Sequence, residues 1–192
     1  MASQGLQEQA ADSLAFIRAT MARSVAFTAV PGRGGIVMGA VGLVAAAAAS
    51  GVSDPRVWLE IWISAAVVAG AAGVAAMHLK SQRHRVPLWS ASGRRFAQGF
   101  VPSLAAGGLL TVALARAGAF DLLPGIWLLL YGAGVLAGAT ASVPVLTWLG
   151  GALMTLGAAA TLSGRFGNLW LAAGFGGLHI IFGFIIARKH GG

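Results

Sequence analysis

The chain has 192 residues, of which 57% are hydrophobic and only 9% charged, and its mean hydropathy is +0.81. A soluble domain carries about 25% charged residues, so this composition excludes an ordinary soluble domain and indicates lipid as the main solvent. The net charge of +8 does not predict nucleic-acid binding, because the basic residues lie between apolar stretches, and the lack of cysteine excludes disulfides and thiolate chemistry.

The first thirty residues predict a surface helix rather than a span. Apolar residues recur at steps of three and four from Leu6 to Val25, which places them on one face of a helix. Charged residues between Glu8 and Arg23 make the segment too polar to cross a bilayer and exclude a cleavable signal peptide. We expect residues 1–30 to form an N-terminal amphipathic interfacial helix, on the membrane surface or packed against the protein's own cytoplasmic face.

Six apolar stretches follow, separated by turn residues and short polar loops. They cover residues 34–52, 57–78, 97–118, 122–141, 144–163 and 168–187. As helices rising about 1.5 Å per residue, they are long enough to cross about 30 Å of hydrocarbon. The sequence therefore predicts an all-α integral membrane protein with a six-transmembrane-helix bundle over residues 31–192.

Lys and Arg are unequally divided between the two sides of this predicted bundle. Only Arg56, Arg116 and Arg165 of the 13 basic residues fall on the side opposite the N-terminus. Because basic loops stay in the cytoplasm, we expect both termini to be cytoplasmic. The sequence shows no targeting segment, which favours a bacterial inner membrane.

A weak internal repeat runs through the spans. Pro31-Gly32 recurs 93 residues later as Pro124-Gly125, and further matches at this offset are Gly39 with Gly132 and Leu43 with Leu136. A duplication of three spans, residues 31–118 and 122–189, would make a 3+3 inverted-topology repeat of the kind found in transporters. The alternative is chance matching in a chain rich in Gly and Ala.

Small residues spaced four apart recur within the spans. Gly35 and Gly39 form one such pair, and Gly134 and Gly138 form another. This spacing lets helix backbones approach closely in a membrane. It predicts a tightly packed bundle, a homo-oligomer or membership of a larger membrane complex, with membrane lipids as the other partner.

His179 is the sharpest candidate for a functional side chain, because it lies near the middle of the last span. An ionisable group at that depth is costly and usually faces a partner or a cavity. The functional interpretations are a proton relay, a haem ligand or a metal ligand. The structural alternative is a neutral histidine bonded to a carbonyl of a neighbouring helix or to a threonine such as Thr111 or Thr155.

Three further polar residues complete the candidate intramembrane site. Glu60 and Arg116 fall at similar predicted depths near the outer face, where they would form an ion pair or lie separately at the interface. Tyr131 lies within the fourth span. A two-histidine haem site would need a second ligand at the depth of His179, and His78 lies elsewhere, so we expect no cofactor and no metal.

The loop between the second and third spans is basic. Its candidate lipid-headgroup ligands are Lys80, Arg83, Arg85, Arg94 and Arg95. Such a patch attracts anionic headgroups, although basic loops also occur simply as topology signals.

Catalytic signatures are absent from the sequence. It contains no GxxxxGK[ST], HExxH or GxSxG motif. An intramembrane serine protease would need a serine deep in the fourth span, and residues 131–138 contain none. We therefore expect no enzyme.

Two functions remain open from the sequence. The first is a structural, accessory or regulatory membrane subunit, which fits the sparse intramembrane polarity. The alternative is a small transporter or channel for protons or a small neutral solute, which fits the repeat and His179. Convergence of His179, Glu60, Arg116 and Tyr131 on one cavity would favour the transporter.

Overall fold

A computed structural model describes residues 12–14, 16–17, 21, 26–84 and 87–190. Its helices are α2 (Gly32–Ala48), α3 (Pro55–His84), α4 (Ala91–Arg116), α5 (Leu123–Ala139), α6 (Val145–Ser163), α7 (Gly167–Leu171) and α8 (His179–His190), with a 3₁₀ turn η1 (Phe120–Leu122) and a π-helical segment η2 (Ala172–Leu178). This confirms the all-α prediction. Most of the predicted interfacial helix lies outside the described residues.

Within the described part of the chain, five helical stretches are long and apolar enough to cross a membrane, judged by length and composition. They are Pro55–Arg83, Ala91–Arg116, Phe120–Ala139, Val145–Ser163 and Gly167–Lys189. The remaining apolar helix, α2, has 17 residues. The five long apolar helices are compatible with a membrane protein.

Local signals explain where the helices begin and end. The Asp54 carboxylate accepts a hydrogen bond from the backbone N–H of Arg56 at 2.8 Å, in the first turn of α3. Ser90 caps α4 in the same way, accepting from the N–H of Gly93 at 3.2 Å. Gly164 ends α6 in the left-handed conformation, with φ of 57°, which glycine adopts without steric cost.

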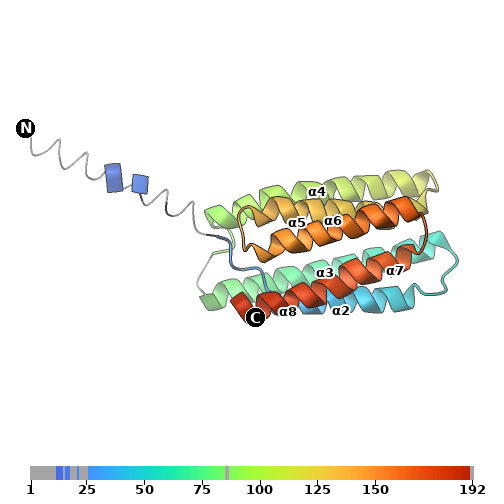
Figure 1. The fold of residues 1–192 in the computed structure, drawn as a ribbon, viewed down its shortest axis with the longest axis horizontal. Helices are drawn as coiled ribbons and strands as arrows, with labels where there is room; N and C mark the ends of the chain where they lie inside the picture. The colour runs from blue at the N-terminus through green and yellow to red at the C-terminus, as the bar shows by residue number, and fades with distance from the viewer. Residues whose placement is uncertain (1–11, 15, 18–20, 22–25, 85–86, 191–192) are drawn as a thin grey trace, which may run out of the picture.

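The helices form two layers, which Figure 1 shows one above the other. In the first layer α2 packs against α3 on one side and against η2 and α8 on the other. In the second layer α5 packs against α4 and α6. The backbones of the two layers come closest where α7, η2 and α8 meet α5 and α6, whereas α3 and α4 hardly touch in the described part of the chain. The Trp58 ring of α3 also stacks on Trp127 of α5, with centroids 5.8 Å apart.

Within the first layer, glycines bring α2 and α8 into backbone contact. A Cβ atom added at Gly183 would lie 2.8 Å from the carbonyl oxygen of Gly32 and 2.7 Å from the nitrogen of Ile36. One added at Gly176 would lie 2.9 Å from Cγ of Leu43. The two helices can approach this closely only because these positions lack side chains.

Within the second layer, α5 and α6 repeat the same contacts. A Cβ atom added at Gly157 would lie 3.0 Å from the carbonyl oxygen of Gly125 and 2.7 Å from the nitrogen of Leu129. One added at Gly150 would lie 2.7 Å from Cγ of Leu136. These contact positions on α5 follow those on α2 by the 93-residue offset found in the sequence, so α2 corresponds to α5 and α8 to α6.

This correspondence differs from the one expected for a duplication of residues 31–118 and 122–189. A duplication in chain order would match α6 with α3, whereas the glycine contacts match α6 with α8. The two layers are therefore built alike, with different connections between their helices.

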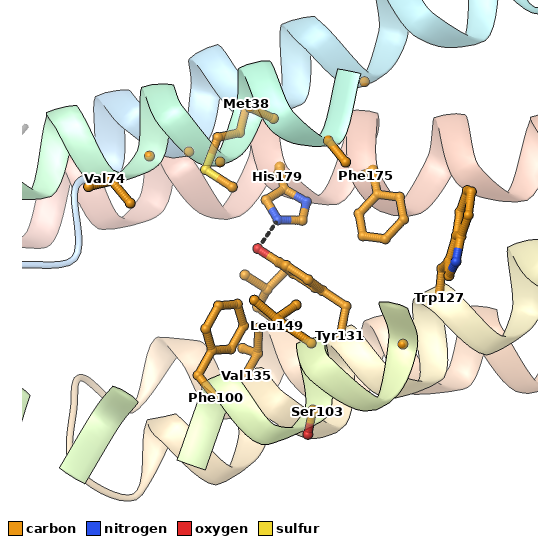
Figure 2. A pocket seen from close by; sticks show the side chains of 18 of the residues that line it. Met38, Val74, Phe100, Ser103, Trp127, Tyr131, Val135, Leu149, Phe175 and His179 are labelled. Atoms are coloured by element: carbon orange, nitrogen blue, oxygen red, sulfur yellow. Dashed lines mark hydrogen bonds between the residues drawn. The ribbon is translucent and has the colours of Figure 1, made fainter. Parts of the chain in front are cut away.

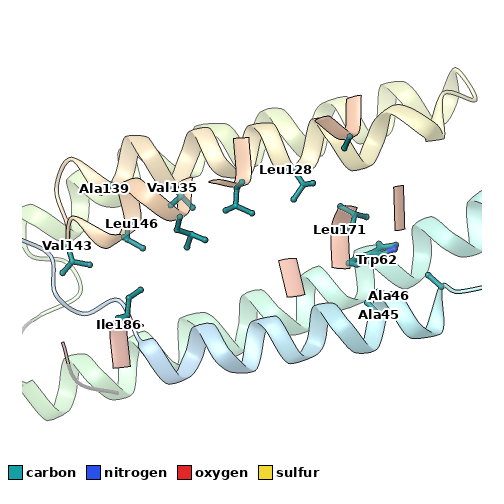
Figure 3. Packing of buried hydrophobic residues seen from close by; sticks show 14 residues of the cluster. Ala45, Ala46, Trp62, Leu128, Val135, Ala139, Val143, Leu146, Leu171 and Ile186 are labelled. Carbon is teal, nitrogen blue, oxygen red and sulfur yellow. The ribbon is translucent and has the colours of Figure 1, made fainter. Parts of the chain in front are cut away.

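Apolar side chains pack in part of the space between the layers. The buried cluster includes Leu128, Val135 and Leu146 from the second layer and Trp62, Leu171 and Ile186 from the first. Figure 3 shows these residues extending from both layers toward the middle of the molecule. Their packing holds the layers together around the site described below.

The segment before α2 is fixed to the turn between α5 and α6. The backbone N–H of Phe27 donates to the carbonyl of Ala141 at 2.7 Å, and the Ser142 hydroxyl donates to the carbonyl of Phe27 at 2.6 Å. The Phe27 ring also stacks on Phe96, with centroids 5.4 Å apart. Residue 27 and the α5–α6 turn therefore lie at the same end of the bundle.

Candidate functional site

A cavity of about 490 Å³ lies between the two layers. Helices α2, α3 and α8 line it from the first layer, and α4, α5 and α6 from the second. None of the described residues that line it is Asp, Glu, Lys or Arg. We call this space the inter-layer cavity.

His179 and Tyr131 meet in this cavity from opposite layers (Figure 2). The Nε2 atom of His179 lies 3.0 Å from the Tyr131 hydroxyl oxygen, and Nδ1 lies 3.1 Å from the carbonyl oxygen of Gly174. The His179 side chain is only 4% exposed. Both ring nitrogens of the buried histidine are therefore hydrogen-bonded.

The partners of His179 determine its tautomer. A carbonyl oxygen can only accept, so Nδ1 must carry the proton and donate to Gly174. In the neutral imidazole Nε2 is then an acceptor, and the Tyr131 hydroxyl donates to it. The phenolic oxygen of Tyr131 keeps a lone pair that can accept one more hydrogen bond.

The π-helical segment η2 places the carbonyl partner of His179. Gly174 lies five residues before His179 and within η2, which runs directly into α8. Gly174 also packs against the second layer, because a Cβ there would collide with the Leu128 side chain. Single π turns inside helices occur frequently at functional sites.

Aromatic rings surround the polar pair. The ring of Tyr131 makes edge-to-face contacts with Phe100, at 5.4 Å between centroids, and with Phe175, at 5.3 Å. Phe175 in turn lies 6.0 Å from the His179 ring. These contacts hold the tyrosine in one orientation and give the cavity an apolar, largely aromatic wall.

The correspondence between the layers relates each residue of the polar pair to an apolar residue. The position of α2 that corresponds to Tyr131 holds Met38, and the position of α6 that corresponds to His179 holds Leu153. Leu153 is fully buried and Met38 lines the cavity. At these corresponding positions the first layer therefore holds Met38 and His179, and the second layer holds Tyr131 and Leu153.

The structure brings together only two of the four predicted site residues. His179 and Tyr131 line the cavity, whereas Glu60 and Arg116 do not. Both of the latter are exposed, and no ion pair joins them in the described part of the chain. The bond from His179 to Tyr131 also replaces the expected threonine partner, since Thr155 bonds to Gly151 and Thr111 to Trp127 and Gly107.

The structure corrects the predicted role of Lys80 as a lipid-headgroup ligand. Its side chain is 4% exposed, and Nζ donates to the carbonyl of Val30 at 3.0 Å. Arg83, Arg94 and Arg95 are exposed, as a headgroup site requires. Arg85 lies outside the described residues.

One polar group was missed in the sequence. Asn168, in α7, donates to the carbonyl of Ala46 at 2.8 Å and accepts from Nε1 of Trp62 at 3.1 Å. It joins α2, α3 and α7 at one end of the first layer. A lone asparagine at the start of an apolar span was the available signal.

Metal or haem ligation by His179 would change the hydrogen bonds that its imidazole now makes. No group of three or more His, Asp or Glu side chains capable of holding a metal ion occurs among the described residues. A haem iron at His179 would have to displace the hydrogen bond from Tyr131.

Comparisons of the chain with protein families, curated proteins and solved structures give no match. The function is therefore argued from the cavity itself.

Proposed function

We propose that this chain is a six-span membrane transporter that binds a small, neutral, largely apolar solute in the inter-layer cavity. The observation that carries the proposal is the His179–Tyr131 pair in the wall of an otherwise apolar cavity. A purely apolar solute crosses a bilayer without help. For a solute with a polar group, loss of that group's hydrogen bonds to water costs roughly 2–7 kcal/mol in hydrocarbon. The His179–Tyr131 pair can replace one of these hydrogen bonds.

The packing supports entry of the solute from the side of the bundle. The cavity is flanked by α3 and α4, which scarcely contact each other, whereas α8 and α6 close the opposite side. In a bilayer the α3–α4 side would face lipid. A solute dissolved in the membrane would then reach the cavity between these two helices.

The fixed position of Phe27 supports six crossings rather than five. Residue 27 and the α5–α6 turn lie at the same end of the bundle, joined by hydrogen bonds of 2.6 and 2.7 Å. An even number of crossings must separate two points on one side of a membrane. Four crossings are obtained only if the short helix α2 spans the membrane together with α3, α4 and α5.

The similar construction of the layers supports alternating access. In a six-span bundle, α2 and α5 cross in opposite directions, as do α8 and α6. A pseudo-two-fold axis in the membrane plane would therefore relate the layers, as in transporters whose halves rock around a shared site. The inter-layer cavity lies between the related halves, where such a site is expected.

The topology can be tested by cysteine labelling, because the chain contains no native cysteine. We expect single cysteines at Ser53, Asp121 and Gly164 to react with an impermeant maleimide in intact cells. A cysteine at Trp89, which is 80% exposed, should react only after permeabilisation. Protection of any of the first three, or labelling of Trp89→Cys in intact cells, would contradict six spans with cytoplasmic termini.

Filling the cavity should abolish solute flux. Gly107 lines the cavity, and a Cβ there would meet only Leu130, at 3.8 Å, so Gly107→Phe adds a ring without a backbone collision. Stopped-flow swelling of proteoliposomes would compare glycerol, 1,2-butanediol and 1,2-hexanediol. We expect the protein to accelerate entry of the more apolar diols, and Gly107→Phe to reduce that acceleration at least tenfold.

Gly151→Phe is the matched control, because nothing lies within 4 Å of a Cβ at Gly151 and this residue does not line the cavity. It should retain the flux. If wild-type protein accelerates no diol, the transporter proposal fails. The accessory-subunit role would then be favoured, with the sparsely buried faces of α3 and α4 as its contact surface.

A further inference from the structure

The indole and threonine donors in the wall of the inter-layer cavity are already used. Nε1 of Trp62 donates to Asn168, and Nε1 of Trp127 donates to Thr111 at 2.8 Å. The Thr111 hydroxyl donates to the carbonyl of Gly107 at 2.7 Å. None of these groups can donate to a solute without breaking an existing bond.

The donors of the His179–Tyr131 pair are also engaged in hydrogen bonds. Nδ1 of His179 donates to Gly174, and the Tyr131 hydroxyl donates to Nε2 of His179. Ser103 also lines the cavity, and its hydroxyl points away from the pair in Figure 2. At the pair itself, what remains open toward a solute is acceptor capacity, the second lone pair of the Tyr131 oxygen.

We infer that the solute of this cavity is an uncharged hydrogen-bond donor, an alcohol or phenol with an apolar body, whose hydroxyl donates to the Tyr131 oxygen. The inference rests on the proposed function and specifies its substrate class. A carbonyl or ether group offers only acceptors, so it would find no free donor at the His179–Tyr131 pair. A charged group would enter a cavity lined by no opposite charge.

The His179–Tyr131 bond is what sets this selectivity. While Nε2 accepts the tyrosine proton, the hydroxyl of Tyr131 cannot donate to a solute. Removal of the imidazole would free that proton, and the tyrosine would then also donate to a carbonyl. His179 is therefore a specificity-determining residue that acts through Tyr131.

The test uses two naphthalene probes and two variants in nanodiscs of one lipid composition, with binding measured by titration calorimetry against empty nanodiscs. 2-Naphthol carries a donor, whereas 2-acetylnaphthalene carries only an acceptor. The variants are Tyr131→Phe/His179→Leu, which removes the pair, and His179→Leu, which frees the tyrosine proton. Leu153 already fills the corresponding position of α6, so leucine suits this packing.

We expect the double variant to bind 2-naphthol about three- to tenfold more weakly than wild type, the value of one hydrogen bond. Its affinity for 2-acetylnaphthalene should change less than about twofold, which also shows that the cavity is intact. His179→Leu should bind 2-acetylnaphthalene more tightly than wild type does. Comparing each probe with itself cancels differences in lipid partitioning.

Each other outcome overturns a definite claim. If the double variant weakens both probes equally, or if His179→Leu leaves 2-acetylnaphthalene unchanged, the donor inference is wrong and the transporter proposal stands. If neither probe binds to wild-type protein, the cavity does not take apolar solutes. The proposed function then fails together with the inference.

Discussion

Gly157→Ala is expected to destabilise the protein by about 1–3 kcal/mol, the usual cost of overpacking a tight contact. A Cβ at this position would lie 2.7 Å from the nitrogen of Leu129 and 3.0 Å from the carbonyl oxygen of Gly125. Both are backbone atoms and cannot rotate away, so α5 and α6 would have to separate. The loss of stability can be measured by thermal unfolding in detergent, monitored by size-exclusion chromatography.

Gly151→Ala is the matched control on the same helix. Nothing lies within 4 Å of a Cβ at Gly151, so alanine there should be neutral or stabilise the helix by up to about 1 kcal/mol. Gly183→Ala, at the corresponding contact of α8 with α2, should lose about as much as Gly157→Ala. Equal stability of the Gly151 and Gly157 variants would refute the close backbone contact.

Asn168→Leu is expected to cost about 2–4 kcal/mol. The substitution leaves the carbonyl of Ala46 and Nε1 of Trp62 without their partner, and each unpaired buried group costs roughly 1–3 kcal/mol. The loss should appear as a lower unfolding temperature. Since Trp62 is 4% exposed, its greater exposure should also increase quenching of tryptophan fluorescence by acrylamide.

Thr155→Val provides the comparison for Asn168→Leu. The Thr155 hydroxyl donates only to the carbonyl of Gly151, at 3.0 Å in its own helix, and the residue is exposed. Its removal should change stability by less than about 0.5 kcal/mol. If Thr155→Val lost as much stability as Asn168→Leu, the hydrogen bonds of Asn168 between helices would contribute no more than a hydrogen bond within one helix.

The helices could be predicted well because their signals are local. Turn residues such as Ser53-Asp54-Pro55 and Gly164 mark the ends of apolar stretches, and the structure places helix boundaries beside them. Length and composition also identify the long apolar helices. The contacts between helices are different, because they depend on how each helix is rotated about its axis, and apolar stretches without a polar face do not reveal that rotation.

In the candidate site, too, single residues could be predicted from the sequence, but the contacts between them could not. Depth in a span identified His179, and Tyr131 was named with it, but the bond between them depends on two layers meeting face to face. Charge alone assigned Lys80 to the lipid surface. The structure instead turns its ammonium group inward to the carbonyl of Val30, which lies before the first turn of α2.

The π-helical segment η2 has a consequence for insertions and deletions in this chain. A π turn holds one residue more than the α-helical turn it replaces. Deletion of one residue from Ala172–Leu178 would restore a regular helix and leave the faces of α7 and α8 nearly unchanged, whereas a regular α-helix of the original length would rotate α7 relative to α8 by about 100°. Asn168 and His179 would then no longer face Ala46 and Tyr131 at once. Homologous chains should therefore keep either the π turn or a segment one residue shorter, because both leave Asn168 and His179 on their present faces.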